Sequence, residues 1–149
     1  METVPLNPLG KKDIKILESA LLVSAIFSPE VIEKIKDPKE RVTWVDSLAV
    51  AAAAFARKKA GMSITEIAEE LGRSESTIMN HLEGKTEAGK IIQKVYEELV
   101  RNKGEVRVKV VEDSATSKKL EELRSKLDLL ENKLKEVIEV FDDIKRTVE

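Results

Sequence analysis

Apolar side chains recur every three or four residues along most of the chain, which is the spacing of helices with one buried face. Within residues 11–27 the pattern rests on Ile14, Leu17 and Leu21. The pair Ser28-Pro29 is typical of a helix start, and Gly61 of a helix end. Outside the segment 63–83, the pattern predicts helices over residues 11–27, 29–36, 39–60 and 86–102.

The predicted helix over residues 39–60 has a stripe of small side chains. The stripe consists of Ala49, Ala52, Ala53 and Ala56. Small side chains allow another helix to approach closely, because they set the distance between packed helix axes. We therefore expect this helix to lie at the centre of a helical bundle.

Residues 105–111 break the helical pattern. Valine alternates with charged residues from Glu105 to Val110, which predicts one short β-strand. A lone strand leaves backbone groups unsatisfied, so it needs a partner. The candidates are the arm at Thr3 and Val4, or the same strand of another subunit.

The segment 118–149 has apolar residues spaced alternately three and four apart, which predicts a coiled-coil oligomerisation helix. Its core positions are Leu120, Leu123, Leu127, Leu130, Leu134, Val137, Phe141, Ile144 and Val148. Leucine occupies most of the a positions. Dimers usually have β-branched residues at a and leucine at d, so this seam is nearly the reverse of that preference. A parallel dimer, an antiparallel pair, a larger bundle and packing on the N-terminal helices therefore all remain open.

The segment 63–83 carries the signature of two short helices joined by a tight turn. Ser63 and Glu66 form a capping box that opens the first helix. Gly72 ends that helix, and Ser74 caps the second. This spacing predicts a helix-turn-helix unit.

The predicted fold class is therefore mainly α: a helical bundle containing the helix-turn-helix, one short β-strand and a C-terminal coiled-coil helix. The predicted domains are a helical domain over residues 1–103 with the helix-turn-helix at 63–83, a strand and linker over 104–117, and the oligomerisation helix over 118–149.

Residues 63–83 resemble the DNA-binding helix-turn-helix of bacterial and archaeal transcription regulators. The resemblance rests on Ile67-Ala68, Leu71-Gly72, Ser74, Thr77-Ile78 and Leu82. Residues 74–82 are similar to the recognition helix of LuxR-type regulators. More loosely, residues 44–96 resemble an archaeal helix-turn-helix family whose members occur beside KaiC-like ATPases. The resemblance implies that double-stranded DNA is the partner.

In a helix-turn-helix protein the second helix lies in the major groove. The side chains predicted to face the bases are Glu75, Ser76, Thr77, Met79 and Asn80. Asn80 is the best single candidate, because an amide can bond adenine at two points. The residues predicted to contact phosphates are Thr65, Arg73, Ser74, Lys85 and Lys90, with Arg57, Lys58 and Lys59 as further candidates.

Composition narrows the chemistry. The 149 residues include no cysteine and one histidine, His81, which we expect to be a partly packed surface residue. We therefore expect no enzymatic activity, no cofactor and no metal site. The net charge is −2, and residues 61–103 carry 8 acidic and 6 basic residues, so a monomer should bind DNA weakly. A homodimer would double the phosphate contacts.

The favoured function is sequence-specific DNA binding as a coiled-coil homodimer that regulates transcription. The alternative is an adaptor, in which the coiled coil recruits a protein partner, such as a KaiC-like ATPase, and the helix-turn-helix is a scaffold. No segment has the length and hydropathy for a membrane span, and we expect a cytoplasmic protein. The abundance of Lys and Glu is typical of proteins from thermophiles.

Overall fold

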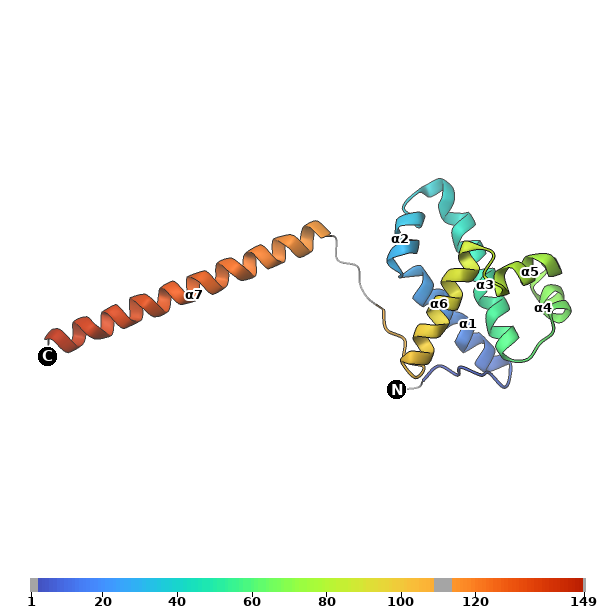
Figure 1. Cartoon of the computed structure of the whole chain (residues 1–149), viewed down its shortest axis with the longest axis horizontal. Coiled ribbons are helices and arrows are strands. Elements are labelled where there is room, and N and C mark those ends of the chain that lie inside the picture. The colour runs from blue at the N-terminus through green and yellow to red at the C-terminus, as the bar shows by residue number, and fades with distance from the viewer. Residues whose placement is uncertain (1–2, 109–113, 149) are drawn as a thin grey trace. The chain divides into compact units, whose positions relative to one another are not determined.

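The computed structural model describes residues 3–108 and 114–148, with the side chains of residues 114–117 left undescribed (Figure 1). The chain divides into two units after Val110, and each is considered by itself. The described helices are α1 (Lys11–Ile26), α2 (Pro29–Ile35), α3 (Pro38–Lys59), α4 (Ile64–Leu71), α5 (Glu75–Leu82), α6 (Glu87–Arg101) and α7 (Ser114–Val148).

Helix α3 is the centre of the first unit, as the alanine stripe predicted. It packs against α1, α2, α4, α5 and α6. Ala52, Ala54 and Ala56 are fully buried on it, which lets its neighbours approach closely. Leu17, Leu21 and Leu48 are also fully buried, and each contributes about 1.5–3 kcal/mol relative to an exposed side chain.

The N-terminal arm, residues 3–10, is irregular and closes over the end of α6. Val4 donates its N–H to the carbonyl of Gly104 at 2.9 Å, and the Tyr96 hydroxyl donates to the carbonyl of Leu6 at 3.0 Å. Gly104 has φ +82°, and a Cβ there would lie 2.7 Å from the Val4 carbonyl oxygen. Glycine is therefore required where the arm crosses the chain.

The predicted strand is wrong for residues 105–108, which form no strand; residues 109–111 lie outside the described residues. The physical reason is the missing partner. The arm's bond to Gly104 lies just before the predicted strand, and it is not continued along residues 105–108. Val106 and Val108 remain exposed, so the valine face of the predicted strand is not buried.

Helix α7 is continuous over 35 residues, about 50 Å at 1.5 Å per residue. The side chains of its predicted core positions are 45–82% exposed. Within the second unit, this apolar seam is therefore not buried. None of the described helices combines the length and hydropathy needed to cross a bilayer.

Candidate nucleic-acid interface

Helices α4 and α5 form the predicted helix-turn-helix beside the C-terminal half of α3 (Figure 1). Ser63 Oγ accepts from the Glu66 N–H at 3.2 Å, and the Glu66 carboxylate accepts from the Ser63 N–H at 2.8 Å. The hydrogen bond from the Ser63 backbone is the main cause that lowers the pKa of Glu66, and the hydrogen bond with the Ser63 hydroxyl lowers it further. Gly72 makes the turn with φ +63°, a conformation that favours glycine.

A small apolar cluster sets the angle between the two helices. Ile67 and Ala68 of α4 and Ile78 of α5 are buried against Ala54 of α3. A side chain larger than Ala68 would separate α4 from α5. This cluster leaves the opposite face of α5 free to contact a partner.

Helix α6 holds α5 from the other side through backbone contacts. The Gln93 side-chain amide donates to the Leu82 carbonyl at 3.0 Å. Gly89 packs directly on the backbone of His81, where a Cβ would collide with the His81 carbonyl. The prediction did not identify Gly89, although a glycine inside a helical pattern is a signal of close packing.

His81 is not the surface residue that was expected, because its side chain is only 8% exposed. Its Nδ1 lies 2.7 Å from Thr86 Oγ1. The same Thr86 oxygen accepts a hydrogen bond from the Gly89 N–H at 3.0 Å. Since that hydroxyl has one proton, it can donate to a neutral Nδ1. Burial lowers the pKa of His81 and favours this neutral form.

The exposed face of α5 carries three of the five predicted base-reading residues. Glu75, Ser76 and Met79 are exposed, and Asn80 is half-buried. Thr77 is half-buried too, and its hydroxyl lies 2.8 Å from that of Ser74. Thr77 is therefore directed toward the helix cap.

Two of the predicted phosphate contacts serve the fold as well. The Ser74 hydroxyl caps α5 by accepting from the Thr77 N–H at 3.1 Å. Thr65 Oγ1, in the first turn of α4, donates to Glu75 Oε1 at 2.9 Å. No local pattern in the sequence predicts this bond, because it joins residues on two different helices.

Among the basic candidates, two are held in exposed ion pairs. Arg73 Nη2 lies 3.4 Å from Asp46 Oδ1, and Lys85 Nζ lies 2.6 Å from Glu83 Oε2. Such pairs contribute little free energy and exchange readily for a phosphate. Lys90 is exposed in α6.

Arg57 is a structural residue, unlike its neighbours. Its side chain is 12% exposed, and its guanidinium pairs with Glu18 of α1 at 2.8 Å and Glu70 of α4 at 3.3 Å. Burial opposes its charge, but the hydrogen bonds and charges of the two carboxylates outweigh burial and raise the pKa of Arg57. It fastens the helix-turn-helix to the bundle, and it is not free for DNA.

A hollow of about 410 Å³ lies beside α5. Met79 and Leu82 form its wall on α5, and Lys58 and Lys59 lie on its α3 side. The Lys59 ammonium is 4.5 Å from the ring centre of Tyr96, a cation–π contact that holds the charge near α5. These lysines place positive charge next to the exposed face of α5.

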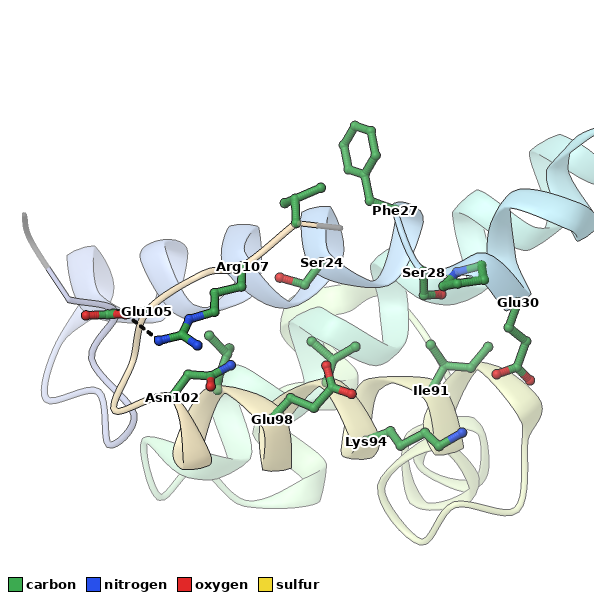
Figure 2. Close-up of a pocket in the computed structure, with 14 residues that line it drawn as sticks. Ser24, Phe27, Ser28, Glu30, Ile91, Lys94, Glu98, Asn102, Glu105 and Arg107 are labelled. Atoms are coloured by element: carbon green, nitrogen blue, oxygen red, sulfur yellow. Dashed lines mark hydrogen bonds and ion pairs between the residues drawn. The ribbon is translucent and has the colours of Figure 1, made fainter. Parts of the chain in front are cut away.

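A separate groove of about 580 Å³ lies between α1 and α6 (Figure 2). Figure 2 shows Ser24 and Phe27 on one side and Lys94 and Glu98 on the other. None of its lining residues comes from α4 or α5, so the groove is distinct from the helix-turn-helix face. Within the described residues, no three His, Cys, Asp or Glu side chains gather in a way that could hold a metal ion.

One comparison with known proteins, a family match, supports the helix-turn-helix. Residues 52–84 match the family described as helix-turn-helix domain, a span that includes the end of α3, α4 and α5. The chain is similar to an uncharacterized protein of Methanocaldococcus jannaschii, with 53% identity over 109 residues. The aligned region covers 73% of this chain and 66% of that protein's length. No solved structure matches the chain.

Proposed function

We propose that the chain is a sequence-specific DNA-binding transcription regulator that acts as a homodimer through α7. The observation that supports it most is the helix-turn-helix with the outer face of α5 exposed and held from three sides by α3, α4 and α6. A helix fixed in this way can enter a major groove without rearranging. The role is one of binding, with no catalytic step.

The charge around α5 explains why a dimer is needed. The helix itself contains Glu75 and no Lys or Arg, so phosphate contacts depend on residues around it. Lys58, Lys59 and Lys90 are exposed there, and Arg73 and Lys85 are available by exchange of weak ion pairs. Each phosphate neutralised adds affinity at low salt, and two copies double that gain.

The exposed seam of α7 supplies a surface for a second copy. In a parallel pair in register, Lys126 at position g faces Glu131 at position e of the second copy, which is attractive. Lys119 faces Arg124 in the same arrangement, which is repulsive, so the two pairs offset each other.

Antiparallel pairing gives a poorer charge pattern, because position g then faces g and e faces e. In one well-overlapped alignment, Lys133 faces Lys133 and Glu131 faces Glu131. In the other, Arg124 faces Lys145. Neither alignment offers an attractive pair, so we propose the parallel dimer. In a parallel pair both helix-turn-helix units are connected to the same end of the coil, which favours half-sites about 34 Å apart.

The alternative function, an adaptor, is favoured by one observation: the exposed face of α5 and its rim carry two carboxylates, Glu75 and Glu83. In that function α7 recruits a protein partner, and a KaiC-like ATPase is the candidate from the family resemblance. The helix-turn-helix would then act as a scaffold.

Selection from random-sequence duplex pools with salt titration separates the two functions. A regulator enriches a two-fold symmetric site, with half-sites about 34 Å apart and an affinity that falls steeply with salt. Asn80→Ala should then weaken operator binding by about 1–3 kcal/mol. An adaptor enriches no sequence even at low salt, and Asn80→Ala leaves its partner binding unchanged.

A further inference from the structure

Glu75 occupies a specific place on the face of α5. It is the first residue of that helix, and its side chain is exposed. The N-terminal residues of a recognition helix are the ones that reach base edges. Of the residues predicted to read bases, it alone carries a charge.

The Glu75 carboxylate is held by the other helix of the motif. Its Oε1 accepts a hydrogen bond of 2.9 Å from Thr65 Oγ1, in the first turn of α4. Within the described part of the chain, Oε2 has no hydrogen-bond partner. The bond limits the orientations of the carboxylate, so less entropy is lost when its second oxygen meets a partner.

A carboxylate on this face distinguishes the bases by their donors. Ionised, it accepts hydrogen bonds and donates none. Guanine presents two acceptors in the major groove, adenine one acceptor beside its amino group, and cytosine an amino donor. A carboxylate therefore fits cytosine best and is repelled by guanine.

Resting on the DNA-binding function proposed above, we infer that Glu75 is a specificity residue that selects cytosine at one position of each half-site, with Thr65 as the residue that positions its carboxylate. Glu75 lowers overall affinity, because its charge opposes the phosphates. Its contribution is discrimination against the wrong bases, which is a difference of affinities.

The test is selection from random duplex pools with the full chain and three variants. For the unaltered protein we expect a site with cytosine at one position, preferred roughly ten- to a hundredfold over the other bases. Glu75→Gln should change that preference to adenine, because glutamine bonds adenine at two points, and leave the other positions unchanged. Thr65→Val, which removes the hydroxyl, should retain cytosine with a several-fold weaker preference.

Glu69→Gln is the matched control, because it removes the same charge from an exposed position of α4. It should leave the selected site unchanged at every position. If the unaltered protein selects a site and Glu75→Gln selects the same one, the inference is overturned and the DNA-binding function stands. If the unaltered protein selects nothing at low salt, the DNA-binding function fails, and the inference fails with it.

Discussion

Gly89 of α6 lies directly against the main-chain carbonyl of His81 in α5, with no room for a Cβ between them. This contact joins the bundle to the helix that presents the candidate DNA-binding face. Beside this contact, the Thr86 hydroxyl makes hydrogen bonds with both the Gly89 N–H and the His81 ring. The position of α5 therefore depends on three residues that do not themselves face the partner.

Gly89→Ala should destabilise the protein by about 1–3 kcal/mol, the usual cost of forcing an atom into a packed contact. The obstacle is backbone, which cannot rotate away as a long side chain can. Urea unfolding of the full chain measures the effect. Lys90→Ala, at the next and exposed position of α6, is the control and should change stability by less than about 0.5 kcal/mol. Equal stability of Gly89→Ala and the unaltered protein would show that α5 moves freely on α6.

Stability should also fall as the pH drops below about 6.5, the ordinary value for histidine. Burial lowers the pKa of His81 in the folded protein, so the unfolded chain binds the proton first. The stability that His81 contributes is complete above its pKa in the unfolded chain. It is lost as the pH falls toward the lower pKa of the folded protein. Because the chain has one histidine, urea midpoints between pH 7.5 and 5.5 should report it with little interference.

His81→Gln is the control for the pH dependence. Glutamine does not titrate, so the variant should be less stable overall but should lose the slope of stability against pH. A slope that persists in His81→Gln would assign the effect to another group.

Arg57→Met should destabilise the protein by about 1–2 kcal/mol, less than the loss of a fully buried pair because Glu18 and Glu70 are partly exposed. Arg57→Lys should recover only part of this, since one ammonium cannot reach two carboxylates as a guanidinium does. Lys58→Met, at the exposed neighbouring position, controls for loss of charge. Urea unfolding checks all three variants. If Arg57→Met is as stable as the unaltered protein, Arg57 has no structural role.

The parts of the fold that follow from local sequence were predictable. Helix ends were marked by residues whose geometry acts within one turn, such as Pro29, Ser63 and Gly72. The strand prediction failed because alternation at Val106 and Val108 says nothing about a partner, and a strand exists only with one.

The candidate site was predictable in position but not in its contacts. The face of α5 follows from the helical period of Ile78 and Leu82. The bond between Thr65 and Glu75 and the burial of Arg57 depend on how separate helices pack, which no local pattern records. For the same reason His81 was expected at the surface, although α6 covers it.

The parallel homodimer can be tested by disulfide crosslinking, because the chain has no cysteine of its own. Leu120→Cys places one thiol at the first core position of the α7 seam. In a parallel pair in register the two thiols face each other and should form a disulfide under mild oxidation, giving a covalent dimer on a non-reducing gel. In an antiparallel pair they lie far apart along helices of about 50 Å, and no covalent dimer forms.

Ser125→Cys, at an outer f position of the same helix, is the matched control and should stay monomeric on the gel because its thiol points away from the partner. Crosslinking of Leu120→Cys without Ser125→Cys supports the parallel dimer. Crosslinking of both at equal rates would mean random collision. If neither crosslinks while the unaltered protein elutes as a dimer, the coil is antiparallel or the dimer forms elsewhere. The two helix-turn-helix units would then not start from the same end of one coil, and the close half-site spacing expected from the parallel arrangement would lose its basis.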